Sequence, residues 1–371
     1  MTPSNTLPEL GPPDDDSRES ARMRFLACAG AGLLRHAINV KYGGFGDTFQ
    51  ALTEVHAELG VRTRDPGLLL AINAHLWGTV FPLLRFGTPQ QKRDWLPGLL
   101  GGELIGGHAI TEPRAGSDIN AMVTTAVDVN SGYRLEGRKR YITNTPLADV
   151  LVVYARDDGT SSLSAFMVRR DDLGVEFRNG PGVKGCATAT MGDVVLSGCE
   201  IPGERLLGKP GAGTVMVQLA LELERAFVFA GITGVMHWQL QRAIEFVRTR
   251  PAAAGYLAGV QGVTHRIADM QLRLETVRLW IRECARLLDD GKRITLASAQ
   301  TKLYASEAFL QSSLDAAHIL GAYGLEGELP GLVHDAMAGR LISGSSEIQK
   351  NMIAAMLGLA PKFRDPSPMG T

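Results

Sequence analysis

The hydrophobic pattern changes type twice along the chain, and the two changes divide its 371 residues into three regions. From about residue 17 to residue 107, apolar residues recur three and four positions apart, as in helices with one buried face. Short runs of β-forming residues separated by turn residues follow. Helical spacing then returns. The order predicts an α+β protein with an N-terminal helical domain at 1–106, a middle β-domain at 107–213 and a C-terminal helical bundle at 214–371.

Local signals support these three regions. Thr88, Pro89 and Gln91 form the pattern of a capping box and predict a helix start. In the middle region, residues 123–129 and 133–143 flank the turn Asn130-Ser131-Gly132 and predict a strand pair, and a second pair is predicted at 149–156 and 162–170. Long helices joined by short connections predict an antiparallel bundle in the last region. They are expected at 214–249, 262–290, 295–320 and 346–358.

The charge and motif content excludes several classes of function. The chain has 38 basic and 39 acidic residues and a net charge of -1, so it offers no overall attraction to nucleic acid or anionic membranes. Its four cysteines are widely spaced, without the pairing typical of a metal site. Glycine-rich dinucleotide and phosphate loops, G-x-S-x-G and H-E-x-x-H are all absent from the sequence. The apolar runs are shorter than the ~18 residues of a membrane span, and the N-terminus lacks a signal-peptide pattern. We expect a cytoplasmic protein with no metal.

The segment Ile110–Asp118 is the first candidate for a binding site. Its Pro and Gly residues force a turn, and its Thr and Ser hydroxyls can bond either a ligand or the local backbone. The segment resembles the T-E-P-x-A-G-S-D signature of the acyl-CoA dehydrogenase family. Three further segments match family motifs in the same order: Tyr141–Asn144 resembles W-I-T-N, Glu200–Gly208 resembles V-P-x-E-N-L-L-G, and Gly344–Gln349 resembles G-T-S-E-I-Q. The resemblance covers about residues 40–358.

This resemblance implies FAD as the cofactor and assigns residues to it. Thr111 and Ser117 are expected to contact the flavin ring and the pyrophosphate. Tyr141 is expected to pack on the ring, with Thr143 near N5. The remaining expected FAD contacts are Ser345 and Glu347.

Four other positions match family residues that reach the FAD of a neighbouring subunit or seat it across the interface. They are Arg250, Gln261, His318 and Gly321. His318 replaces the Gln of the family's Q-x-x-G-G-x-G, where it either supplies the hydrogen bond of that amide or packs in the bundle. The resemblance thus implies a homodimer or homotetramer.

The catalytic base departs from the commonest family pattern. Many members carry a Glu directly before the G-T motif, but this chain has Ser343 there, which cannot act as a base at neutral pH. Either the chain is inactive, or another carboxylate serves. Glu224 matches the base position of the isovaleryl-CoA and long-chain subgroups. Its helical neighbours, Leu221, Phe227, Val228 and Gly231, are apolar or small, as expected for a buried base, although a Glu paired with a distant Arg would show the same pattern.

The resemblance then implies a reaction. Glu224 takes the α-proton of an acyl thioester, the Ser343 main-chain N–H and a flavin hydroxyl hold the carbonyl oxygen, and a β-hydride passes to flavin N5, giving an enoyl thioester. Arg225 is assigned to substrate binding. The substrate is expected to be an acyl-CoA or an acyl group on a carrier protein, because the helical region before Gly43 is short, as in members that serve polyketide and peptide biosynthesis. The expected electron acceptor is an electron-transfer flavoprotein or another acceptor.

Three alternatives remain open from the sequence. A flavin oxidase or monooxygenase could use the same fold with oxygen as the acceptor. Oxidation of a carrier-bound hydroxyacyl group would change the position of the chemistry. An inactive subunit that binds or assembles partners would purify without flavin.

Overall fold

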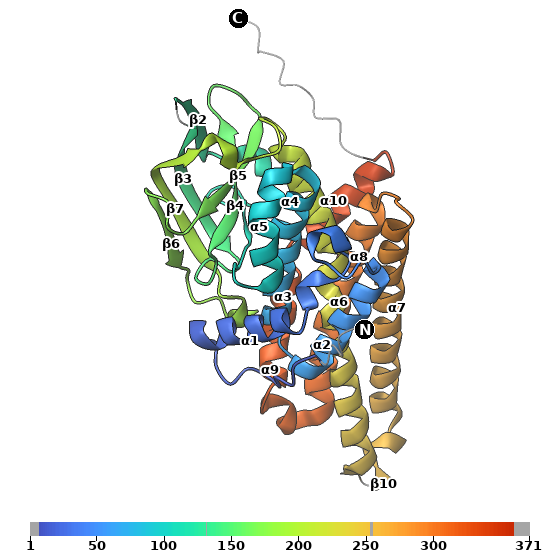
Figure 1. Ribbon diagram of the computed structural model, residues 1–371. Helices are drawn as coiled ribbons and strands as arrows, with labels where there is room; N and C mark the ends of the chain where they lie inside the picture. The colour runs from blue at the N-terminus through green and yellow to red at the C-terminus, as the bar shows by residue number, and fades with distance from the viewer. Residues whose placement is uncertain (1–6, 131, 253–254, 360–371) are drawn as a thin grey trace, which may run out of the picture.

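The computed structural model describes residues 7–130, 132–252 and 255–359 of the chain, and shows a twisted sheet on one side of a large helical body (Figure 1). Ser131 of the predicted turn, Ala253 and Ala254, and the last residues of the predicted bundle domain lie outside the described residues. The helices before and after the sheet pack against each other, so residues far apart in sequence meet between them.

The N-terminal region is helical, as predicted. Its helices are α1 (Arg18–Gly30), α2 (Phe49–Thr63), α3 (Pro66–His75), α4 (Phe81–Phe86) and α5 (Pro89–Gly101), with a π-helical segment, Leu76–Val80, joining α3 to α4. The capping box at the start of α5 is confirmed, since Thr88 Oγ1 accepts the Gln91 N–H and the Gln91 side chain accepts the Thr88 N–H.

The helical stretch Pro66–Phe86 is long and apolar enough, by length and composition alone, to cross a membrane. The sequence analysis missed it because it counted only uninterrupted apolar runs. In the structure, however, 89% of its most apolar window is buried inside the protein. It is therefore placed as a core helix, covered by protein on nearly all sides.

An eight-stranded sheet forms the middle region within the described residues. Its strands are β1 (His108–Ala109), β2 (Thr125–Val129), β3 (Gly132–Ile142), β4 (Val150–Asp157), β5 (Leu163–Arg169), β6 (Val175–Asn179), β7 (Gly192–Pro202) and β8 (Leu206–Leu207). They lie in the order β6-β7-β3-β2-β4-β5-β8, and β1 pairs with β4 in parallel. Both predicted strand pairs, β2 with β3 and β4 with β5, are confirmed as antiparallel.

The C-terminal region contains α6 (Gly213–Thr249), a short β9–β10 hairpin (Pro251–Ala252 and Gly255–Tyr256), α7 (Gln261–Asp289), α8 (Thr295–Leu320), α9 (Leu329–Gly339) and α10 (Ser346–Met356). The four predicted helices are present, and α9 is an additional helix that the sequence pattern did not reveal.

The long helix α6 runs through the centre of the molecule and packs against α2, α3, α7 and α8. It approaches α2 at glycines: a Cβ on Gly60 would collide with the Gly231 carbonyl, and a Cβ on Gly234 would collide with the Ala57 carbonyl. All residues of α6 from Leu223 to Met236 are buried. They include three with polar side chains, Glu224, Arg225 and Thr233.

Candidate active site

The carboxylate of Glu224 lies in the interior between α6 and the sheet. The residue is 5% exposed. Within the part of the chain that the structure describes, its side chain is paired with no Arg or Lys, and its nearest charged or titratable partner is His108 of β1, with 3.6 Å between His108 Nε2 and Glu224 Oε2. The alternative of a Glu neutralised by a distant Arg therefore has no support in this geometry.

The loop at Ser343 contacts α6 through Arg225, the residue after Glu224. Ser343 has φ 55° and Gly344 has φ 92°, so two successive residues adopt the left-handed conformation. The Ser343 carbonyl accepts hydrogen bonds from Arg225 Nε at 3.1 Å and from Gln349 Nε2 at 3.3 Å. Among the described residues, the Ser343 N–H donates to no protein atom. The loop therefore offers one free N–H donor, held in place through its carbonyl.

Arg225 is buried, and its recorded hydrogen bond goes to Ser343 rather than to Glu224. The sequence assigned Arg225 to substrate binding. In the structure Arg225 Nε donates to the Ser343 carbonyl and so holds this peptide group in place. Arg225 can therefore affect a bound substrate by positioning the Ser343 loop.

The segment that follows β1 is anchored by Glu112. Its carboxylate accepts the N–H groups of Val123 and Thr124 at 2.7 and 3.0 Å and pairs with Lys139 Nζ at 2.8 Å. Burial opposes the charge on Glu112, yet Lys139 and these donors hold the pKa of the carboxyl below its ordinary value. Burial lowers the pKa of Lys139 to about 8. Glu112 thus binds the local backbone, a role that the sequence analysis considered only for the Thr and Ser hydroxyls of this segment.

The other motif residues present groups that are free to meet a ligand. Thr111, Ser117 and Thr143 are half-buried or exposed, and their hydroxyls bond no protein atom within the described ranges. Tyr141 is 49% exposed, has φ 58°, and carries the Arg140 guanidinium 5.0 Å from its ring centre. The Arg140 N–H donates to the Thr111 carbonyl, which keeps these residues together. An exposed aromatic ring and hydroxyls that bond no protein atom among the described residues fit a planar cofactor with polar edges, such as a flavin.

The start of α10 completes this side of the site. Ser345 is its N-cap, accepting the Ile348 N–H at 3.5 Å, and Glu347 is exposed in the first turn. Because these residues directly follow the Ser343 loop, the chain brings Ser345 and Glu347 close to the position of Glu224 and Arg225.

Comparison with known proteins agrees with this geometry over the whole chain. Family models for the N-terminal, middle and C-terminal domains of acyl-CoA dehydrogenases match residues 9–103, 107–199 and 211–358. The chain belongs to the acyl-CoA dehydrogenase family. This confirms the predicted family and the predicted order of helical, β and helical regions. Since the family consists of FAD-dependent dehydrogenases, the predicted cofactor and enzyme class are confirmed as well.

Several relatives combine high coverage with moderate identity. The chain is 36% identical to an L-prolyl-[peptidyl-carrier protein] dehydrogenase of Pseudomonas fluorescens over 93% of both chains. It is 32% identical to the mitochondrial short-chain specific acyl-CoA dehydrogenase of Mus musculus, over 88% of this chain and 80% of the mouse protein.

Two similar solved structures are of proteins that are named with a prolyl group or contain proline. The prolyl acyl carrier protein oxidase AnaB has a TM-score of 0.88 and 34% identity over 91% of each chain. PigA with FAD and proline has a TM-score of 0.90 and 30% identity over 95% of this chain and 94% of that chain.

Four predicted cofactor residues of this family member lie elsewhere. Arg250 follows the end of α6, Gln261 begins α7, and His318 and Gly321 lie at the end of α8; all four are exposed. The end of α6 and the β9–β10 hairpin lie away from the sheet (Figure 1). Arg250 stacks on Tyr323 and Phe246, with its guanidinium 5.3 and 5.9 Å from their ring centres. Because His318 is exposed, the structure does not support the interpretation that its side chain packs in the bundle. One chain does not bring these four residues to Glu224.

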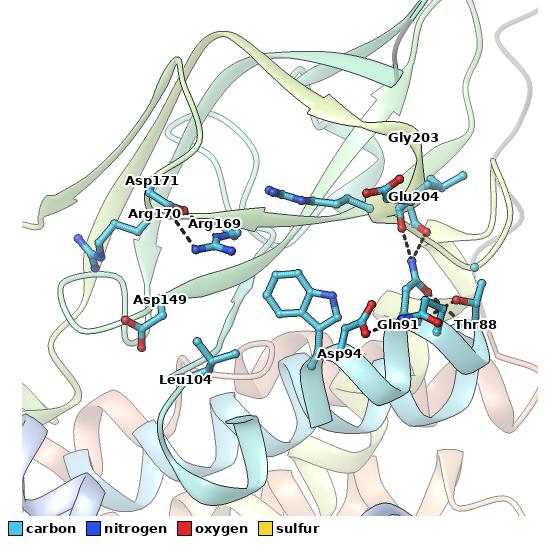
Figure 2. Close-up of a pocket in the computed structure, with 15 residues that line it drawn as sticks. Thr88, Gln91, Asp94, Leu104, Asp149, Arg169, Arg170, Asp171, Gly203 and Glu204 are labelled. Carbon is cyan, nitrogen blue, oxygen red and sulfur yellow. Dashed lines mark hydrogen bonds and ion pairs between the residues drawn. The ribbon is translucent and has the colours of Figure 1, made fainter. Parts of the chain in front are cut away.

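A large groove lies apart from the residues described above. It has a volume of about 1020 Å³ and lies between α5, the end of β5 and residues 203–208. Figure 2 shows Gln91 and Asp94 on its α5 wall, facing Arg169 and Glu204. None of the residues predicted for catalysis or for FAD lines this groove. The groove therefore gives no support to the predicted site residues.

Two contacts of the site were missed by the sequence analysis. The Arg225–Ser343 hydrogen bond joins residues of two different motifs, and the His108–Glu224 contact joins α6 to the strand before the first motif. The only available signal for His108 was its position three residues before Thr111, which by itself indicates no role.

Proposed function

We propose that this protein is an FAD-dependent dehydrogenase that oxidises an aminoacyl thioester carried by a carrier protein, with Glu224 as the base. The observation that carries the proposal is a buried carboxylate, unpaired with any Arg or Lys of the described chain, beside a loop whose Ser343 N–H is free. A base and a donor to the carbonyl oxygen are the two groups that removal of an α-proton requires.

Each of these residues has a separate role in the proposed reaction. Glu224 accepts the proton from the carbon next to the thioester carbonyl. The Ser343 N–H donates to the carbonyl oxygen as negative charge develops there, and Arg225 keeps that N–H in place by binding the Ser343 carbonyl. Tyr141, Thr111, Thr143 and Ser117 hold and orient the cofactor. When bound, FAD supplies a two-electron acceptor for the hydride that leaves the substrate.

The carrier-bound aminoacyl group is supported by two relatives that match this chain over more than nine-tenths of its length. The Pseudomonas enzyme is named for a prolyl group on a peptidyl-carrier protein, and AnaB for a prolyl group on an acyl carrier protein. The short-chain acyl-CoA dehydrogenase of Mus musculus is less similar and matches less of its own length. Acyl-CoA substrates are therefore the second expectation for the same chemistry.

The test is single-turnover reduction of the bound flavin without oxygen. Purified holoprotein is mixed with prolyl-, other aminoacyl- and fatty acyl-carrier proteins, and with the matching CoA thioesters, while flavin absorbance is followed. Bleaching by prolyl carrier protein well ahead of the other thioesters is expected. Preferential bleaching by acyl-CoA would reject the carrier assignment, and a yellow protein that no thioester bleaches would reject the dehydrogenase itself.

An oxidase is the second candidate, because AnaB, to which this chain is similar with a TM-score of 0.88, is named an oxidase. Admitting air after the anaerobic reduction separates the two. Rapid reoxidation with stoichiometric peroxide identifies an oxidase. Slow reoxidation in air, with fast reoxidation by an electron-transfer flavoprotein or an artificial acceptor, identifies a dehydrogenase.

The exposed group at the end of the bundle supports a homo-oligomer as part of this proposal. Arg250, Gln261, His318 and Gly321 lie where α6 and α8 end and α7 begins, whereas Tyr141 and Thr111 belong to the sheet region. The β9–β10 end of the bundle and the sheet lie on opposite sides of the molecule (Figure 1). A second copy would bring them to the cofactor of the first.

A further inference from the structure

His108 and Glu224 approach each other from different domains of the fold. His108 Nε2 lies 3.6 Å from Glu224 Oε2, and the two side chains are 12% and 6% exposed. Nothing in the reaction proposed above uses this imidazole. An inference about it rests on Glu224 being the base and concerns how that base is held.

The His108 ring occupies a space that two neighbouring elements prepare. A Cβ on Gly78, in the π-helical segment between α3 and α4, would lie 2.8 Å from His108 Cγ, so only glycine leaves room for the ring. The approach to β1 is fixed by two further bonds. The Thr79 hydroxyl donates to the Gly107 carbonyl at 2.8 Å, and the Gly106 N–H donates to His75 Nδ1 at 2.9 Å. The ring is therefore positioned by the core and has little freedom to turn away from Glu224.

The contacts of the ring favour one position for its hydrogen. A carboxylate can only accept, so an attractive contact with Glu224 requires a hydrogen of the imidazole on Nε2. Nδ1 is buried and has no partner among the described residues. No contact at Nδ1 therefore competes with the contact to Glu224.

We propose that His108 is a positioning residue for the base: its Nε2–H donates to one oxygen of Glu224 and leaves the other oxygen directed at the substrate. The 3.6 Å separation is longer than a hydrogen bond, and such contacts tighten when substrate excludes water from the site. Fixing the carboxylate matters because a small displacement of a reacting group costs up to about a hundredfold in rate.

The test compares two substitutions of His108 in the FAD-loaded protein. His108→Phe keeps the planar ring and removes the donor, whereas His108→Gln keeps an N–H near the position of Nε2. The rate of flavin reduction at saturating substrate is expected to fall about 10- to 100-fold in His108→Phe and less than about fivefold in His108→Gln, with substrate affinity nearly unchanged in both. His237→Gln is the matched control. His237 lies about 20 Å from Glu224 along α6, and the variant should behave as wild type.

A double variant shows whether His108 acts through Glu224. If it does, His108→Phe adds no further loss to Glu224→Gln in single-turnover reduction. Multiplied losses in the double variant, or equal losses in the Phe and Gln variants, would overturn the proposal, as would full activity of His108→Phe. Wild-type protein that no thioester reduces would instead reject the proposed function, so the two failures are distinguishable.

Discussion

The two ends of α6 carry predicted site residues in opposite states. In its first half, Glu224 and Arg225 are buried and contact β1 and the Ser343 loop. At its C-terminal end, Arg250 is exposed beside the equally exposed Gln261, His318 and Gly321. The first arrangement is complete within one chain, because its partners come from the same molecule. The second consists of exposed residues, and under the proposed homo-oligomer they would contact the FAD of another copy.

The largest effect is expected at the buried end, from Glu224→Gln. The substitution keeps the size of the side chain and removes the proton acceptor, so the rate of anaerobic flavin reduction should fall about 10²- to 10⁴-fold. Stopped-flow absorbance of the bound flavin measures it. Glu245→Gln, at an exposed position of the same helix, is the control. If Glu224→Gln reduces flavin as fast as wild type, Glu224 is not the base and another residue removes the proton.

A large effect on stability is expected from Glu112→Gln, in the segment that follows β1. It leaves Lys139, fully buried, without its charged partner, and breaking a buried pair in this way costs about 3–5 kcal/mol. Urea unfolding gives the free-energy difference. Glu176→Gln breaks the exposed pair with Arg178 and should cost less than about 1 kcal/mol. Equal costs for the two variants would mean that Glu112 does not anchor the motif.

At the exposed end, Arg250→Gln should change cofactor binding and leave folding intact. Loss of a charged hydrogen bond to FAD across an interface is expected to weaken FAD binding about 10- to 100-fold, with unfolding by urea nearly unchanged. Flavin fluorescence titration measures the affinity, and sedimentation measures the state of association. Arg248→Gln, also exposed near the end of α6, is the control. Unaltered FAD affinity in an intact oligomer would show that the exposed end does not serve the cofactor.

The fold was largely predictable from hydrophobic spacing, and the exceptions have physical causes. Strand β7 was not predicted because Gly192 and Gly198 interrupt its pattern, yet it pairs with both β3 and β6. Helix α9 was missed because Pro330 and Gly331 occupy its first turn. It is stabilised by burial of Leu329, Leu332 and Ala336 against its neighbours, which no local pattern reveals.

The site was predictable where its residues form contiguous motifs. Thr111, Tyr141 and Ser345 were found because each lies in a short segment with a distinctive order of residues. The contacts that connect these segments were not found. Arg225 and Ser343 are 118 residues apart, and His108 is linked to Glu224 only through the packing of β1 on α6. Such pairings depend on tertiary structure, and a single sequence carries no signal for them.

The smallest effect is expected from His318→Ala, at the exposed end. The side chain is exposed in one chain, so the packing role is disfavoured and thermal stability should change little. If His318 replaces the hydrogen bond of the family's Gln, FAD affinity should fall about two- to tenfold, and His318→Gln should restore it. Flavin fluorescence titration of both variants measures this. A stability loss in His318→Ala with unchanged FAD affinity would instead assign the imidazole to contacts between subunits, because the exposed surface of one chain offers it no other packing partner.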